Sequence, residues 1–322
     1  MYSFYFHVLK KLSFGLLARK KLRISAFIVS KSRHILYGFV LFLMTVSLTG
    51  CGRIIIYSAR PLVDDISKSF MQQQDVDLAE QGTPTFLLFL DGLIAHSPKD
   101  KTLLLSGAKA YSSYTSAFVG DNYPERNKIL AEKAREYAFR AFSLHNREFA
   151  KAKEKPHSEF LTYLPSFGER DVPYLFSAAA CWSGWIQANS ESWDAIADLP
   201  KVQSLFERAL ELDESFYYGA SHTFMGILLT IRSPSLGGRP EEARKHFERA
   251  LELGDGRFLP TYVLYAKHYA KLVYEEKLFY DLLDRVLDSP VDEVPELILV
   301  NRLAQRQAGD LVDDARKEEY FK

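Results

Sequence analysis

The sequence offers few side chains whose type and spacing could support catalysis or metal binding. It contains no His-Glu-x-x-His, P-loop, Gly-x-Ser-x-Gly or Cys-x-x-Cys motif. Cys181 has no cysteine partner other than Cys51, so we expect it to be a small buried apolar residue. The histidines beyond residue 50 lack the spacing of metal ligands; they are His96, His145, His157, His222, His246 and His268. We therefore predict no catalytic residue, no metal site and no cofactor.

The residue for which the pattern predicts covalent chemistry is Cys51. The apolar segment Ile35–Leu48 carries no charge and has 14 residues, too short to span a bilayer as a helix but suited to an export signal. Basic residues precede it, and it runs into Leu48–Cys51 (LTGC), which is similar to a bacterial lipobox. In such signals the cysteine is linked to diacylglycerol and becomes the first residue after cleavage. The alternative is an ordinary signal anchor followed by a chance cysteine.

The segment before this apolar stretch is unusually long for an export signal, at 34 residues. Either it is real or the start codon is assigned too early. We therefore expect a signal peptide over residues 1–50, with an N-terminus that is over-extended in the second case, and one all-helical domain over 51–322. Gly52 follows the cysteine where an aspartate would favour retention at the inner membrane. We expect a periplasmic, lipid-anchored protein, on the outer membrane rather than the inner one.

The balanced charge of the whole chain, 41 basic against 41 acidic residues, combines two unlike parts. Residues 1–50 hold eight basic residues and no acidic one, which leaves 33 basic against 41 acidic residues in the 272 that remain. This net charge of −8 argues against nucleic acid as a partner, because nucleic-acid binders present a basic face. It is compatible with a protein tethered to a membrane by lipid.

An internal repeat predicts the fold. The heptapeptide FERALEL occurs at Phe206–Leu212 and again at Phe247–Leu253. Around both copies, and again from Ala134 and more weakly from Phe279, apolar residues recur at the spacing of one face of an amphipathic helix. Start-to-start distances of 41 and 36 residues fit a helical hairpin of tetratricopeptide length with loop insertions. The third distance, 68 residues, indicates one hairpin with a long loop inserted over Lys151–Pro173.

A more apolar helix is expected before each of these four. The expected ranges are Leu103–Phe118, Tyr174–Ala188, Tyr217–Ile231 and Leu259–Tyr274. Proline followed by acidic residues at Pro124 and Pro240 marks two helix starts, and Gly254 and Gly256 stand where a helix end is expected. The last segment, Pro295–Phe321, predicts a C-terminal capping helix. The fold class is therefore all-α, an irregular tetratricopeptide-like solenoid of helical hairpins.

Aromatic residues make up 14% of the chain and concentrate in the more apolar helices. They could line a groove for a ligand, or they could pack the helices against one another. The groove candidates are Trp182, Trp185, Tyr218, His222, Tyr262 and Tyr265. The alternative for His222 is burial in the core. We also expect His268 to be buried in the core and His246 to be solvated.

The resemblance to a known family depends on three features: the lipobox, the hairpins and the loop Ser233–Ala243 (SPSLGGRPEEA), with Val300–Arg306 in support. Together they are similar to the T component of tripartite ATP-independent periplasmic (TRAP) transporters, over essentially all of Cys51–Phe321. The resemblance implies association with the substrate-binding component of the transporter, a homotrimer, and a small hydrophobic or organic-acid ligand. It implies no enzymatic activity.

Two other classes of function remain as alternatives. The chain could be an outer-membrane assembly scaffold that binds protein segments on its helical surface. An enzyme acting on cell-wall material is a third reading, which the lack of paired acid and base residues disfavours.

Overall fold

The computed structural model describes residues 61–232, 235 and 237–321, and these are helical with no strand among them. The prediction of an all-α fold is confirmed. The predicted signal peptide over 1–50 and the lipidation candidate Cys51 lie outside the described residues. From Leu62 onward the chain forms one compact unit.

The first described helix covers residues 61–71, and thirteen α-helices with printed bounds follow it in the described part. They are α2 (Val76–His96), α3 (Lys101–Tyr114), α4 (Pro124–His145), α5 (Arg147–Ala152), α6 (His157–Phe160), α7 (Val172–Ala188), α8 (Trp193–Ala197), α9 (Leu199–Leu212), α10 (Phe216–Thr230), α11 (Pro240–Gly254), α12 (Pro260–Tyr265), α13 (Glu276–Asp288) and α14 (Ile298–Lys317). Two π-helical turns extend α3 and α12, η1 (Thr115–Val119) and η6 (Ala266–Ala270).

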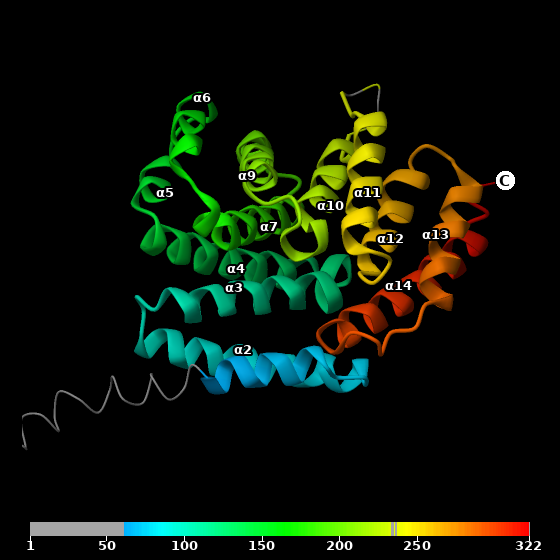
Figure 1. Cartoon of the computed structure of the whole chain (residues 1–322), viewed down its shortest axis with the longest axis horizontal. Helices are drawn as coiled ribbons and strands as arrows, with labels where there is room; N and C mark the ends of the chain where they lie inside the picture. The colour runs from blue at the N-terminus through cyan, green and yellow to red at the C-terminus, as the bar shows by residue number, and fades with distance from the viewer. Residues whose placement is uncertain (1–60, 233–234, 236, 322) are drawn as a thin grey trace, which may run out of the picture. The chain divides into compact units, whose positions relative to one another are not determined.

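Consecutive long helices pack against one another along the chain. α2 packs on α3, α3 on α4, α4 on α7, α7 on α9, α9 on α10 and α10 on α11 (Figure 1). The four predicted apolar helices correspond to α3, α7, α10 and α12 with its extension, and the four amphipathic ones to α4, α9, α11 and α13. The helical periodicity therefore located these eight elements correctly.

Two apolar clusters form the core. One joins α4, α5, α7 and α9 around buried residues such as Phe142, Trp182 and Phe206. The other joins α11 to α14 around Phe247 and Tyr265. Burial of this apolar surface, at roughly 25 cal/mol per Å², is the main driving force that holds the helices together.

The predicted helix boundaries near proline and glycine agree with the structure in part. α4 begins at Pro124 and α11 at Pro240, each with proline in the first turn and glutamate beside it. α11 ends at Gly254, but the residue after it in the left-handed region is Asp255, with φ 49°, followed by Gly256 with φ 69°. Aspartate tolerates this conformation better than most residues with a Cβ, so the cap uses both positions.

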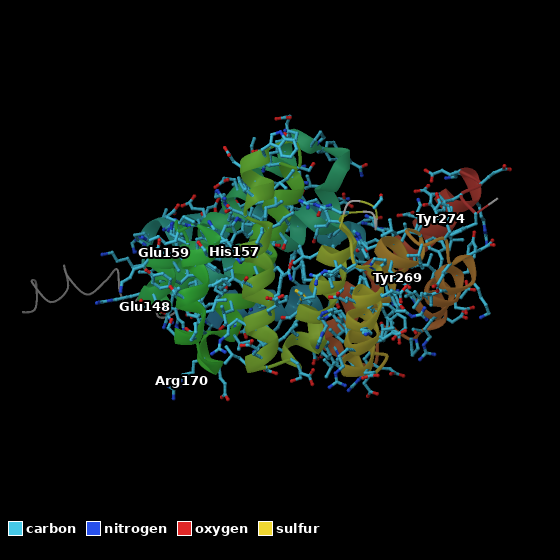
Figure 2. All side chains as sticks on the ribbon, turned by 90° about the horizontal axis from the view of Figure 1, so that it is seen from above. Glu148, His157, Glu159, Arg170, Tyr269 and Tyr274 are labelled. Carbon is cyan, nitrogen blue, oxygen red and sulfur yellow. The ribbon has the colours of Figure 1, made fainter. Side chains whose placement is uncertain are left out.

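The segment expected to be a long loop, Lys151–Pro173, contains regular structure instead. The end of α5, α6, two 3₁₀ turns and the start of α7 occupy it. Figure 2 shows His157 and Glu159 of this segment, with Glu148 of α5, at the end of the unit opposite to Tyr269 and Tyr274. His157 Nε2 lies 3.0 Å from Ser204 Oγ, and Phe160 and Phe167 are buried, which ties the segment to α9. Pro156 and Pro165 favour a loop in the sequence because proline interrupts helices. In the structure they allow short helical turns instead.

α2, which has 21 residues, is not among the helices expected from the sequence. Pro84 inside Gly82–Thr85 resembles a turn, yet the helix continues through it, and Thr83 Oγ1 donates to the carbonyl oxygen of Ala79 at 2.6 Å. Asp75 caps the start by accepting from the backbone N–H groups of Asp77 and Leu78. Tertiary packing therefore overrides the local propensity of proline.

A polar contact fixes α2 to its neighbours. The carboxylate of Asp91 accepts hydrogen bonds from Tyr111 of α3 at 2.8 Å and from Tyr137 of α4 at 2.7 Å, and it pairs with Lys133. Burial raises the pKa of Asp91, but the three donors outweigh it and lower the pKa overall. The half-buried carboxylate is thus fully partnered and joins three helices.

The C-terminal segment forms a helix as predicted, and it also reaches the beginning of the fold. α14 packs on α12 and α13 and contacts α2. Arg306 Nη1 lies 3.0 Å from Asp77 Oδ1, and Nη2 lies 3.4 Å from Glu80 Oε2. The last helix of the described chain therefore contacts one of the first.

Candidate functional site

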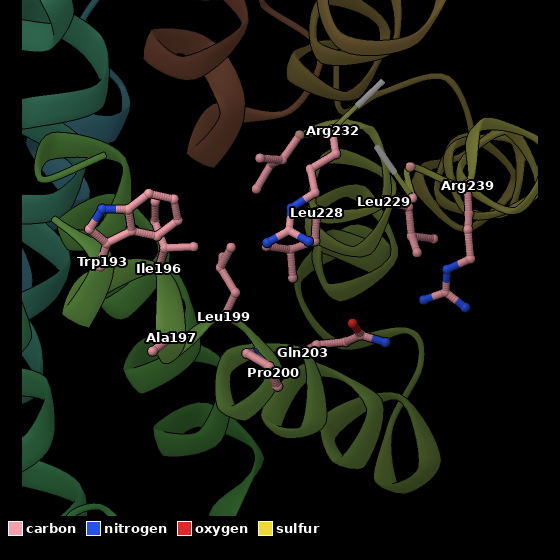
Figure 3. Close-up of a pocket in the computed structure, with 13 residues that line it drawn as sticks. Trp193, Ile196, Ala197, Leu199, Pro200, Gln203, Leu228, Leu229, Arg232 and Arg239 are labelled. Carbon is pink, nitrogen blue, oxygen red and sulfur yellow. The ribbon is translucent and has the colours of Figure 1, made fainter. Parts of the chain in front are cut away.

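A pocket of about 430 Å³ opens where the end of α10 meets α8 and the start of α9 (Figure 3). Three groups of residues line it: Trp193, Ile196 and Ala197 from α8; Leu199, Pro200 and Gln203 from α9; and Leu228, Leu229, Ile231, Arg232, Gly237, Gly238 and Arg239 from α10 and the connection to α11. Most of this lining is apolar. The volume lies within the range of ligand and anchor pockets.

Local sequence explains how the pocket walls are held. Ser192 Oγ accepts from the backbone N–H of Ala195 at 3.4 Å and so begins α8, which places Trp193 in its first turn. On the opposite wall, the backbone N–H of Arg239 donates to the carbonyl oxygen of Leu229 at 2.9 Å. Pro240 then starts α11. The loop that carries the family-like Gly237–Arg239 is thus fastened to the end of α10.

The polar groups of the pocket are mostly cationic. Its lining contains two arginines and no acidic residue. Arg239 pairs with Glu242 outside the lining at 2.9 Å, whereas Arg232 is exposed and forms no ion pair with any residue that the structure describes. Such a pocket can bind an apolar group that carries a carboxylate, because the carboxylate can pair with the guanidinium of Arg232.

Trp182 and Trp185, two of the aromatic groove candidates, belong to the cluster around α7. Trp182 is 1% exposed and meets Phe139 edge to face, with 4.9 Å between ring centroids. Trp185 is partly buried under the guanidinium of Arg135, whose Cζ lies 3.7 Å from the ring centroid. Burial of Trp182 in the core fits the packing alternative for that residue.

Tyr262 and Tyr265 belong to the other cluster, which involves α12. Tyr265 is 2% exposed and stacks on Phe247 at 4.9 Å between centroids. Its hydroxyl has no hydrogen-bond partner among the described residues, and burial raises its pKa. Tyr262 is partly buried against the same cluster. The structure therefore separates these two residues from the tryptophan pair.

Tyr218 and His222 lie at the start of α10, in an unusual backbone. Tyr217, Tyr218 and Gly219 all have left-handed φ values, 48°, 59° and 71°. Such a conformation costs energy for residues with a Cβ. Tyr218 stacks on Phe258, with centroids 5.4 Å apart and planes 4° apart. The regular part of the helix begins after these three residues.

The histidines of α10 and α11 differ in part from the expectation. His222 Nδ1 lies 2.8 Å from His246 Nδ1, and His222 Nε2 lies 3.3 Å from Glu214 Oε2. His246 is therefore half-buried against α10 rather than solvated. Burial, reinforced by His222, lowers the pKa of His246 to about 4. Arg249 holds the pKa of Glu214 down at about 2 through a 2.5 Å contact.

A second hollow of about 520 Å³ lies between α4, α7 and the start of α9. Its rim alternates in charge, and its ions are largely paired with each other; for example, Lys201 Nζ lies 3.0 Å from Asp198 Oδ1. Trp182 lines its floor, but the indole Nε1 is buried. The balanced rim gives this hollow little preference for a ligand of either charge.

The described residues contain no group of three or more His, Cys, Asp or Glu side chains that could hold a metal. None of the helices formed by these residues is long and apolar enough to cross a membrane. Cys181 is a free, buried cysteine, as expected, and burial raises its pKa to about 12. Its thiol is therefore protonated at neutral pH.

The exposed large apolar residues of the pocket, Trp193 and Ile231, were not among the predicted site residues. A signal was present, because Trp193 stands alone as a large apolar residue in the polar stretch Asn189–Asp194. Gly237–Arg239 is held to α10 by the backbone hydrogen bond of Arg239, and the same three residues line the pocket.

Comparison with known proteins identifies relatives of the whole helical unit. The profile of the TRAP transporter T-component family matches residues 72–321. An uncharacterized protein of Treponema pallidum (strain Nichols) is 23% identical over 259 residues, which cover 76% of this chain and 80% of the relative. The family match begins between the first described helix and α2 and ends after α14, so it includes the pocket and both core clusters.

Proposed function

The chain belongs to the T-component family of TRAP transporters, and from this premise we propose that it is a periplasmic, lipid-anchored accessory protein that binds the substrate-binding component of a TRAP uptake system. The family has an accessory role in transport and is not an enzyme family. The observation that carries the proposal is the extent of the match, since residues 72–321 comprise nearly all of the described helices.

The role in transport that we propose is to hold or hand over a small ligand, hydrophobic or an organic acid. Support comes from the match to the T-component family over residues 72–321, which implies such a ligand. A homotrimer is part of the proposal, on the grounds of the family resemblance. No catalytic step is required of any residue.

Attachment to the membrane is part of the proposal, and the lipobox-like sequence Leu48–Cys51 supports it. A lipidated Cys51 would tether the acidic mature chain at the outer membrane, facing the periplasm. Replacing the thiol tests this directly: Cys51→Ser is expected to move the protein from the membrane fraction to the soluble fraction and to abolish labelling with radioactive palmitate. Cys181→Ser is the matched control and should leave both unchanged.

The partner is tested by affinity purification from detergent-solubilised membranes of cells that express the tagged full chain. Mass spectrometry is expected to identify a periplasmic substrate-binding protein of a TRAP system, in amounts that exceed those from an unrelated lipoprotein carrying the same tag. Recovery of barrel-assembly proteins alone would contradict the transport role and support the scaffold alternative. The oligomeric state follows from the mass of the purified protein by light scattering.

A further inference from the structure

We infer that Trp193, Ile231 and Arg232, which we name the α8–α10 groove, dock an apolar side chain flanked by a carboxylate on the surface of the substrate-binding component. The inference rests on the proposed function, and it assigns the contact to one face of the molecule. All three residues line the pocket of Figure 3, where the Arg232 side chain extends toward Leu228.

The exposure of the groove residues is the first argument. Trp193 is 84% exposed and Ile231 is 53% exposed, so two large apolar side chains stand in water at one pocket. Single exposed apolar residues are common, but a tryptophan that lines one pocket together with a second exposed apolar residue and an arginine has the composition of the energetically dominant centre of protein interfaces. Covering these residues would recover the free energy of burying their apolar surface.

The same exposure argues for a protein partner rather than a small molecule. Pockets for small ligands bury most of the ligand surface, typically 70–90%. With Trp193 and Ile231 so open to solvent, a small molecule here would remain wet on one side. A protein surface can insert one side chain between the walls and cover the exposed rim with its neighbours.

Charge defines the chemistry of the partner. The chain beyond residue 50 has 33 basic and 41 acidic residues, yet the pocket lining contains two arginines and no acidic residue. Arg232 lacks an ion-pair partner among the described residues, whereas Arg239 already pairs with Glu242. A carboxylate on the incoming surface therefore has an available guanidinium in Arg232, and a charge-assisted hydrogen bond would fix its orientation.

The walls of the groove are held in place before a partner arrives. The backbone bond from Arg239 to Leu229 and the Ser192 cap of α8 fix the two sides. Leu205 and Phe206 of α9, the helix that supplies Leu199, Pro200 and Gln203 to the lining, are fully buried. Pre-organised walls reduce the entropy lost on association.

The inference is tested with the lipidated full chain in detergent and the purified substrate-binding protein identified by the affinity experiment. Binding is titrated by biolayer interferometry for the wild type, Trp193→Ala and Arg232→Gln. Trp193→Ala is expected to weaken the Kd at least about 10-fold, and Arg232→Gln about 5-fold with a smaller dependence on salt. Because all three residues are at the surface, thermal unfolding should be unchanged.

Matched controls come from exposed residues elsewhere. Ile129 of α4 is 69% exposed, and Arg147 at the start of α5 is exposed without an ion pair among the described residues. Ile129→Ala and Arg147→Gln are expected to keep the Kd within about 2-fold of the wild type.

Three outcomes would overturn the inference. If the wild type binds and both groove variants bind equally well, the groove assignment is wrong while the proposed function stands. If Trp193→Ala instead abolishes self-association in light scattering and leaves partner binding intact, the groove joins copies of this chain. If the wild type binds no substrate-binding protein, the proposed function itself fails together with the inference.

Discussion

The two copies of FERALEL, in α9 and α11, are identical in sequence and differ in what surrounds them. Phe206 and Phe247 are both fully buried, and so are Ala209 and Ala250. Phe206 stacks on Phe224 at 5.1 Å between centroids, whereas Phe247 stacks on Tyr265 at 4.9 Å. The repeated residues determine the helix and its buried face, and residues distant in the sequence determine the partner of each ring.

The arginines of the two copies also have different partners. Arg208 donates from Nε and Nη2 to the carbonyl oxygen of Phe167, at 3.2 and 2.6 Å. Arg249 pairs with the carboxylate of Glu214. Arg208 therefore ties the Lys151–Pro173 segment to α9. Arg249 instead ties α11 to Glu214, just before the start of α10. Four predictions address these differences, from the largest expected effect to the smallest.

Removing the buried rings should have the largest effect. Phe206→Ala and Phe247→Ala are each expected to lower the free energy of unfolding by about 3–5 kcal/mol, because each leaves a cavity in a fully buried cluster. Urea unfolding followed by circular dichroism measures the loss. A loss below about 1 kcal/mol for either variant would contradict the common role of the two copies.

The second prediction distinguishes the environment of Phe247. A Cβ added at Gly226 would lie 2.6 Å from the Phe247 ring, so Gly226→Ala is expected to destabilise the protein by about 1–3 kcal/mol through overpacking. At Gly184 of α7 an added Cβ meets nothing within 4 Å. Gly184→Ala should therefore be neutral or stabilising by up to about 1 kcal/mol, which reflects helix propensity alone. Equal effects at both positions would show that Phe247 has room to move.

The third prediction concerns the residue before each phenylalanine, Leu205 in α9 and His246 in α11. The folded protein lowers the pKa of His246 from 6.5 to about 4, so the unfolded chain binds more protons between these pH values. The free energy of unfolding should fall by about 1–2 kcal/mol as the pH drops from 6.5 to 4. The groups around His246 are His222, Glu242 and Arg239, with Glu214 and Arg249 beyond His222.

Replacing His246 by the residue of the other copy checks that assignment. His246→Leu should reduce the pH dependence, and the part due to His222 should remain because the pKa of His222 is lowered too. His96→Leu, at an exposed end of α2, is the control. If the free energy of unfolding of His246→Leu falls with pH as steeply as that of the wild type, other groups cause the pH dependence.

The smallest expected effects are those of the arginines. Arg208→Lys should cost about 1 kcal/mol, because lysine cannot donate twice to the Phe167 carbonyl. Arg249→Lys should cost about 0.5 kcal/mol, because its pair with Glu214 is partly exposed. Urea unfolding in low and in high salt distinguishes the two losses of stability. Only the loss caused by Arg249→Lys should become smaller as the salt concentration rises. The same salt response in both would remove the distinction between the copies.

The sequence predicted those parts of the fold that depend on local pattern. The eight repeat helices and the C-terminal helix followed from periodicity, and the starts at Pro124 and Pro240 followed from proline chemistry. It failed for α2, where Pro84 is accommodated by packing, and for the Lys151–Pro173 segment, where single turns replace a loop. In both regions the structure depends on contacts with residues distant in the sequence, which a local sequence pattern does not include.

The candidate site was less predictable than the fold. Aromatic density indicated Trp182 and Tyr265, which the structure buries in separate clusters. Trp193 and Arg232 are 39 residues apart in the sequence and line the same pocket because α8 and the end of α10 face it. A local pattern can identify an unusual residue such as Trp193, but the combination of residues at a site requires the fold.

The most direct test of the account is photo-crosslinking from position 193 in intact cells. Trp193→benzoylphenylalanine is introduced in the full chain, with Ile129→benzoylphenylalanine as the matched exposed control. The account predicts a crosslinked product with a TRAP substrate-binding protein from position 193 and none from position 129. Products containing only barrel-assembly proteins, or no product from position 193 in a membrane-anchored chain, would contradict it.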